Sequence, residues 1–208
     1  MSGAAQFASF LFASALVIVV PGPATLFVAG RAHASTRAAV AAVAGIVAGD
    51  VVLIVLSGLG VAVLVERWPN LLDAVRIVGA LYVAWLGIGL LRAAGAPAAA
   101  ATAAQRAHAG DALRGLLLTL SNPKPILFFA AFFPLFLDPA AVPAMQGYYR
   151  LGAWFELLNL TWFALLVLAV RRLRHSDALA ALPRGLVHRL AGGGLLLCAA
   201  LVWVRGAG

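Results

Sequence analysis

The sequence predicts an all-α membrane protein, a polytopic bundle of six transmembrane helices arranged as two inverted three-helix repeats. Three observations predict this fold: an apolar composition, six long apolar stretches, and a proline-rich interruption in the first and the fourth of them. Hydrophobic residues make up 64% of the 208 residues and charged residues 11%, whereas a soluble domain is about half apolar and about a quarter charged. A soluble fold of this length has too little interior to bury so much apolar surface, so we expect the lipid bilayer to surround it.

Six apolar stretches approach or exceed the roughly 20 residues that a spanning helix needs. They are residues 6–29, 38–65, 72–91, 113–137, 146–170 and 186–204. The last is the weakest candidate, because its uncharged core, Leu190–Val204, is short unless Arg189 reaches the interface. Residues 4–30 carry no ionisable side chain and no Lys or Arg precedes them, so we do not expect a cleaved signal peptide.

The arginines are distributed unevenly between the connections. The connections after the first, third and fifth stretches hold ten of them, and those after the second and fourth hold three. Because Lys and Arg resist translocation, the arginine-rich connections are expected to face the cytoplasm. We therefore expect a multi-pass protein of a bacterial cytoplasmic (inner) membrane with both termini outside. The C-terminus would lie inside if the sixth stretch does not span.

The chain divides into two halves of three spans each. Residues 1–92 form the first predicted repeat, 93–111 a cytoplasmic linker, and 112–208 the second repeat. An odd number of spans in each repeat places the second copy upside down, as in the inverted repeats of many secondary transporters.

Each half begins with an interrupted helix. The first span contains Pro21-Gly22-Pro23 and the fourth contains Asn122-Pro123-Lys124-Pro125. Proline removes a backbone donor and clashes with the preceding turn, and unwound backbone in a membrane is tolerated only inside protein or beside a wet cavity. Paired breaks in corresponding helices point to a transporter's binding site. The alternative is that both are packing kinks without a ligand.

Three charged residues lie well inside the apolar stretches, about ten residues or more from either end. Asp50 and Glu156 occupy the second span of each half, and an ionised carboxylate there costs about 2.5–3.5 kcal/mol on insertion scales. We assign both to proton coupling, the alternative being a structural partner. Lys124, the only lysine, could hold a substrate carboxylate, neutralise Asp50, or extend to the interface.

Two asparagines and two glycines complete the candidate set. Asn122 and Asn159 offer amide donors and acceptors to a ligand, although Asn122 could instead cap the helix after the break. Gly45 and Gly49 form a G-x-x-x-G pattern, which we interpret as close helix packing. The predicted substrate-binding residues are Pro21, Gly22, Pro23, Asn122, Pro123, Lys124 and Asn159.

These residues resemble those of a known family, the LysE/RhtB-type amino-acid exporters, over nearly the whole chain. The matching elements are Pro21-Gly22-Pro23, Gly45 with Gly49-Asp50, Val78-Gly79-Ala80-Leu81-Tyr82 with Trp85-Leu86-Gly87, and Asn122-Pro123-Lys124 with Phe128-Phe129 and Phe132-Phe133-Pro134. The resemblance implies six spans in two inverted halves and export of amino acids or their derivatives driven by the proton gradient. A homodimer is one oligomeric state that the sequence allows.

The sequence departs from the usual pattern of this family at several positions. Ala24 follows the first break where a polar residue is common, and Ser35-Thr36 replaces a glycine. Pro125 stands where alanine is frequent, and Glu156 is not expected. The hypothesis is an antiporter whose two halves rock around a pocket between the breaks, with Asp50 exchanging a proton.

Composition and motifs argue against other classes of function. The net charge of +8 comes from arginines between apolar stretches, so nucleic-acid binding is not expected. Cys198 is the only cysteine, which excludes an intrachain disulfide. We expect no metal site, no cofactor and no enzyme, because no span gathers a nucleophile with a base or a set of metal ligands. An inorganic-ion exporter, an intramembrane enzyme and a membrane scaffold remain as alternatives.

Overall fold

The computed structural model describes residues 3–68, 71, 74, 77–78, 80–81, 84–85, 88–89, 91–92, 110–137, 143–173, 193 and 196–197, and every regular element among them is helical. The predicted third stretch is helical at each position described between 71 and 92. Most of the linker and of the sixth stretch lies outside the described residues. The all-helical class is therefore confirmed, whereas the full six-span arrangement stays a prediction.

The first predicted span is two helices, α1 (Gly3–Val19) and α2 (Pro23–Ala34), which meet at an angle of 58°. The break falls at the predicted Pro21-Gly22-Pro23. Gly22 is the N-cap of α2 in an extended conformation, and Pro23 takes the first helical position, where its missing N–H removes no helical bond.

A single residue separates α2 from the next helix, α3 (Thr36–Arg67). The backbone N–H of Ser35 donates to the Arg31 carbonyl and closes α2, while the Ser35 hydroxyl accepts from the Ala38 N–H and caps α3. Arg31 and Arg37 therefore lie within helices, and not in a connecting loop as the sequence suggested.

The fourth predicted span is also broken, at an angle of 54°. It consists of α5 (Asp111–Ser121), α6 (Pro123–Leu127), the π-helix η1 (Phe128–Phe132) and the 3₁₀-helix η2 (Phe133–Phe136).

The fifth span is one long helix, α7 (Ala144–Leu173). Two unbroken stretches, Thr36–Val63 and Ala144–Arg172, are long and apolar enough to cross a membrane, and the two bent pairs raise the number to four if each pair is one span. These four correspond to the first, second, fourth and fifth stretches predicted from the sequence.

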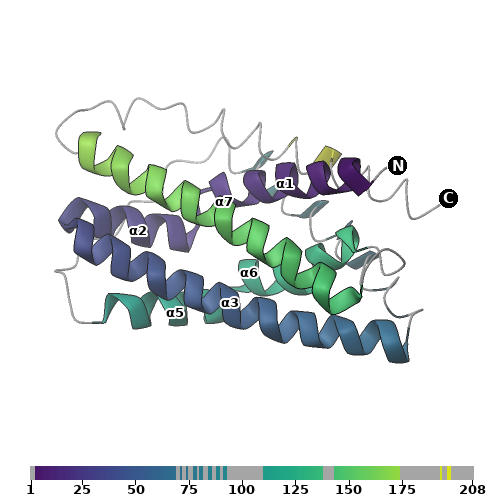
Figure 1. Cartoon of the computed structure of the whole chain (residues 1–208). Coiled ribbons are helices and arrows are strands. Elements are labelled where there is room, and N and C mark those ends of the chain that lie inside the picture. The colour runs from purple at the N-terminus through teal and green to yellow at the C-terminus, as the bar shows by residue number, and fades with distance from the viewer. Residues whose placement is uncertain are drawn as a thin grey trace.

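Pairwise contacts give the relative directions of the helices. Along α3, Gly45 lies against Ala112 and Gly49 against Thr119, so α3 and α5 are parallel. Ile54 lies against Gly152 and Gly58 against Tyr149, so α3 and α7 are antiparallel. The first broken span runs alongside α7, with Phe7 near Trp154 and Ala32 near Arg171. The two broken spans therefore run in opposite directions (Figure 1).

Candidate functional site

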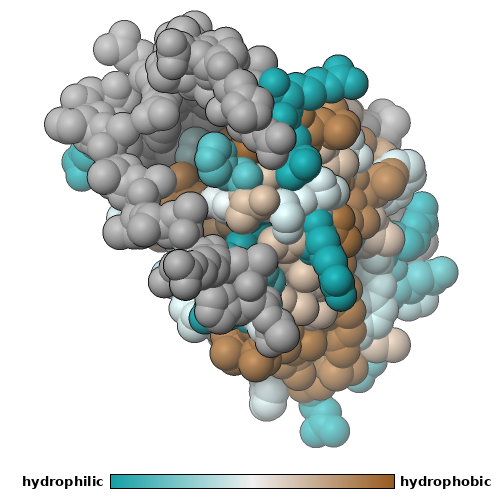
Figure 2. Space-filling model, turned by 90° about the vertical axis from the view of Figure 1, so that its left-hand side faces the viewer, coloured by the Kyte–Doolittle hydropathy of each residue, from teal (hydrophilic) through white to brown (hydrophobic). Residues whose placement is uncertain are grey.

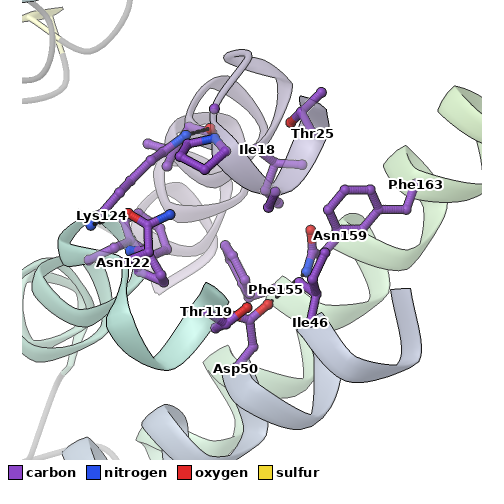
Figure 3. Close-up of a pocket in the computed structure, with 16 residues that line it drawn as sticks. Ile18, Thr25, Ile46, Asp50, Thr119, Asn122, Lys124, Phe155, Asn159 and Phe163 are labelled. Carbon is purple, nitrogen blue, oxygen red and sulfur yellow. Dashed lines mark hydrogen bonds between the residues drawn. The ribbon is translucent and has the colours of Figure 1, made fainter. Parts of the chain in front are cut away.

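A small cavity lies where the two helix breaks face the middle of α3 and α7. Its volume is about 80 Å³, enough for several water molecules at the 10–15 Å³ or so that each needs. The polar side chains that line it are Thr25, Asp50, Thr119, Asn122, Lys124 and Asn159. The larger apolar side chains that line it are Val17, Ile18, Ile46, Phe128, Phe155 and Phe163. Figure 3 shows Lys124 and Asn122 on one side and Asp50 with Asn159 on the other.

Lys124 joins the two broken spans. Its ammonium donates to the Val17 carbonyl at 2.8 Å and to the Val20 carbonyl at 3.5 Å. In an unbroken helix the Val17 carbonyl would accept from the N–H of residue 21, but Pro21 has none. The ammonium therefore replaces the missing amide and places a positive charge at the negative end of α1.

The second break is stabilised by its own residues Asn122 and Pro123. Asn122 accepts a hydrogen bond from the Lys124 N–H through its Oδ1 atom at 3.0 Å, and Pro123 occupies the first position of α6. The capping role of Asn122, one of the two alternatives drawn from the sequence, is thus confirmed. Asn122 also lines the cavity, so its amide group faces the space in which a ligand would bind.

Asp50 and Asn159 form the polar contact between α3 and α7. Asn159 Nδ2 donates to Asp50 Oδ2 at 3.0 Å, and both residues are only 5% exposed. A buried carboxylate needs a donor of this kind, because leaving it without one carries a large desolvation penalty. Figure 3 shows both side chains at the edge of the cavity, where a ligand or a proton could reach Asp50.

Glu156 lies one helical turn before Asn159 on α7, within electrostatic reach of Asp50. Both of its carboxylate oxygens are buried, and neither has a hydrogen-bond partner among the described residues. Glu156 is not one of the cavity-lining residues. Of the two predicted carboxylates, only Asp50 lines the cavity.

The N-terminus of α2 also faces the cavity. Ala24 and Thr25 occupy the second and third helical positions, whose backbone N–H groups have no partner within a helix. The N-cap residue Gly22 has no side chain with which to cap this end of α2. The first N–H groups of a helix and the positive end of its dipole together favour an anion, and the Lys124 ammonium lies close by, 3.8 Å from the Cβ position of Gly22.

Close packing of α3 on α5 defines one wall of the site. A Cβ at Gly45 would collide with the backbone of Ala112, and a Cβ at Gly49 would lie 2.7 Å from the Thr119 side chain. Gly115 reciprocates from α5, since its Cβ would lie 2.5 Å from the Ala42 carbonyl. The packing interpretation of Gly45 and Gly49 is confirmed.

An aromatic cluster closes the cavity on the side of η1. Phe128 and Phe155 line the cavity and pack together with ring centroids 5.2 Å apart, and Phe132 stacks on Phe128 at 4.5 Å. The π-helical turn leaves the Phe129 carbonyl to the buried Tyr148 hydroxyl, which donates to it at 2.6 Å. This cluster excludes water from one side of the polar residues.

Comparison with known proteins identifies the chain. A family model described as LysE type translocator matches residues 15–205. The chain belongs to the LysE-type translocator family. A protein of Enterobacter sp. strain 638 called leucine efflux protein is 34% identical over 201 residues, which cover 90% of this chain and 92% of the relative.

Two further relatives agree with this assignment. The leucine efflux protein of Klebsiella pneumoniae is 35% identical over 170 residues, covering 80% of both chains. An uncharacterized membrane protein of Pseudomonas aeruginosa is 36% identical over 177 residues, covering 82% of both chains. No solved structure matches the chain. The LysE/RhtB resemblance seen in the sequence is therefore confirmed.

In this LysE-type translocator, most of the residues predicted to bind substrate lie at the cavity. Those that line it are Gly22, Pro23, Asn122, Lys124 and Asn159, together with the predicted proton-coupling residue Asp50. Pro21 and Pro123 are exposed and do not line the cavity, so they contribute to the breaks: Pro21 follows the end of α1, and Pro123 begins α6. Among the described residues, no group of three or more His, Cys, Asp or Glu side chains is placed to hold a metal ion.

Two threonines that line the cavity of this translocator were not predicted from the sequence. Thr25 follows the first break on α2, and Thr119 precedes the second by one helical turn on α5. Their positions beside the breaks could have indicated them, since a polar residue within one turn of a capping residue lies on the same face of the helix.

Proposed function

We propose that the chain exports a small aliphatic amino acid, leucine or a close analogue, across the bacterial inner membrane. The observation that carries the proposal is the cavity between two oppositely directed broken spans, with a cation on one side and a buried carboxylate on the other. Relatives that cover most of the chain are named leucine efflux proteins, which supports the substrate class.

The cavity offers a partner to each part of such a substrate. The backbone N–H groups of Ala24 and Thr25, with the Lys124 ammonium beside them, receive the carboxylate. Asp50 receives the α-ammonium group, and the Asn159 amide orients the Asp50 carboxylate. Ile46 and Phe163 of the lining contact the aliphatic side chain.

Asp50 is also the group that we propose binds a proton and the substrate ammonium in turn, so that a proton moves inward for each substrate that moves outward, which makes the transporter an antiporter. Its carboxylate can hold a proton or pair with the substrate ammonium, but burial disfavours a free charge. Glu156 supports the exchange, because the charges of two neighbouring carboxylates repel and a proton on one relieves the other.

The distribution of arginines supports the expected orientation. Arg37 opens α3, Arg114 lies in the first turn of α5, and Arg171 and Arg172 lie in the last turn of α7, all at the end where α2 and α3 meet. Figure 2 looks onto this end and shows hydrophilic side chains among apolar ones. We propose that this end faces the cytoplasm, with the N-terminus outside and six spans forming two inverted repeats.

Efflux from membrane vesicles tests the proposal. Vesicles are loaded with a panel of labelled amino acids, and efflux is measured with and without a proton uncoupler for the parent, Asp50→Asn and Lys124→Met. Uphill efflux of leucine should stop with the uncoupler and fall about tenfold or more in both variants, because each removes one charge of a buried site. Glu66→Gln, an exposed carboxylate on the same helix as Asp50, serves as the control. Parent-like efflux in both variants would remove Asp50 and Lys124 from the mechanism.

A further inference from the structure

A buried ion pair connects the two broken spans away from the cavity. Arg31 Nε lies 3.1 Å from Asp111 Oδ1, and the two side chains are 5% and 3% exposed. Arg31 lies in the last turn of α2 and Asp111 is the first residue of α5. The Arg31 guanidinium also lies over the Phe27 ring, 5.5 Å from its centroid. The pair thus joins α2 to α5 at the arginine-rich end of the bundle.

The same two helices reach the cavity at their other ends. Thr25 of α2 and Thr119 of α5 line the cavity, six and eight residues from the ion pair, which corresponds to about 9 Å and about 12 Å along the helix axes. A cluster of buried apolar residues, Val28, Ala42, Ile46 and Phe163, packs in this region, and Ile46 and Phe163 of the cluster also line the cavity. A path from the cavity to this end between α2 and α5 would pass the ion pair.

The neighbouring contacts decide which helices can separate. The glycine contacts between α3 and α5 bring their backbones together, so opening there would break closely packed surface. The α2 helix packs on α3 and α7 through the buried Val28 and Ala32, and its contact with α5 is less extensive and includes the ion pair. Separation of α2 from α5 is therefore the opening that disturbs the least packing.

An ion pair at this position has a property that an apolar contact lacks. Two charges buried together gain little over well-packed apolar side chains, whereas each can be hydrated when the contact opens to water. The contact can therefore close the end in one state and open in another without exposing new apolar surface.

We infer that Arg31 and Asp111 form the gate that holds the arginine-rich end of the cavity closed and opens when α2 moves away from α5. This inference rests on the proposed function, in which substrate enters the cavity from that end. It assigns a role to two residues outside the predicted binding and proton-coupling sets.

Thiol labelling in the intact transporter tests the gate. Cys198, the only cysteine, is replaced by alanine, and Ala24→Cys places a thiol in the cavity wall. The rate of reaction with a membrane-impermeant methanethiosulfonate is then measured in right-side-out and inside-out vesicles. A separate Arg172→Cys variant, exposed on α7, shows which vesicles present the arginine-rich end.

Breaking the ion pair should raise labelling of Ala24→Cys from that end only. Asp111→Asn and Arg31→Gln are each expected to raise the rate about tenfold, as a tenfold larger open population would. The charge-swapped variant Arg31→Asp with Asp111→Arg should return the rate toward that of the parent. Arg37→Gln, which removes an exposed arginine at the same end, should leave it unchanged.

Two results would overturn the gate: a parent-like rate in folded Asp111→Asn, or a charge swap that labels as fast as the single variants. If Asp111→Asn does not yield folded protein, Arg31→Gln decides, since it removes the other charge of the pair. A raised rate there supports the gate and a parent-like rate contradicts it. Labelling needs no substrate, so it stands or falls separately from leucine efflux.

Discussion

The Lys124 ammonium donates at 2.8 Å to the Val17 carbonyl, which is the acceptor that Pro21 leaves without a backbone donor. The residues are 107 positions apart in the sequence and belong to different broken spans. A side chain of the second break thus supplies the hydrogen bond that the first break lacks, so the first break depends on the second for this stabilising contact.

This dependence predicts a coupling between Lys124 and Pro21. Lys124→Met should lower the free energy of unfolding by about 1–3 kcal/mol, because a buried carbonyl loses its donor. In a Pro21→Ala background residue 21 regains its N–H, so the same substitution should cost less. Thermal unfolding of the four variants in detergent gives the interaction energy. Additive effects would show that the ammonium does not replace the amide.

The glycine contacts predict a position-specific effect along α3. Gly45→Ala should destabilise the protein by at least about 1–3 kcal/mol, because the new methyl group meets the Ala112 backbone, which cannot move away independently of α5. Gly60→Ala is the matched control on the same helix, with nothing within 4 Å of its Cβ position. Thermal unfolding in detergent should show a lower midpoint for Gly45→Ala alone, and equal midpoints would contradict the packing.

Two adjacent tyrosines provide a test of the π-helical turn. The Tyr148 hydroxyl donates at 2.6 Å to the Phe129 carbonyl, whereas the Tyr149 hydroxyl lies 3.5 Å from the Val55 carbonyl. Tyr148→Phe should cost about 0.5–1.5 kcal/mol of unfolding free energy and Tyr149→Phe less. The comparison requires only two midpoints, and the reverse order would mean that Tyr148 does not stabilise the turn.

The hydrogen bond from Asn159 to Asp50 should contribute measurably to the free energy of unfolding. Asn159→Leu leaves the buried Asp50 carboxylate without the donor seen at 3.0 Å and should cost about 1–3 kcal/mol, more if the carboxylate stays charged. Replacing both residues by leucine should cost less than this single change, because no unpaired polar group remains. Thermal unfolding of both variants checks this, with Thr161→Ala on the exposed face of α7 as the control.

Local sequence rules predicted much of the fold. Proline fixes where α1 ends and where α6 begins, whatever the rest of the chain does, so both breaks could be located from the sequence. The G-x-x-x-G pattern likewise predicted close packing, since only small residues allow backbones to approach. Length and hydropathy predicted the four spans that the structure describes.

The partners of the polar residues could not be predicted in the same way. Arg31 was expected to lie in a connection, and its partner Asp111 stands 80 positions later at the start of another helix. The sequence suggested a substrate carboxylate or Asp50 as the partner of Lys124, but its ammonium donates to the carbonyls of Val17 and Val20, at and just after the end of α1. Such contacts depend on which helices pack against each other, and a single sequence does not determine which helices do so.

The glycine contacts have a consequence for movement. They join α3, from the first half of the sequence, to α5, from the second, with their backbones in close contact. A conformational cycle in which the halves rock as separate units would have to break this contact. The boundary between moving and stationary parts is therefore expected to cross the sequence repeats, with α3 and α5 moving together.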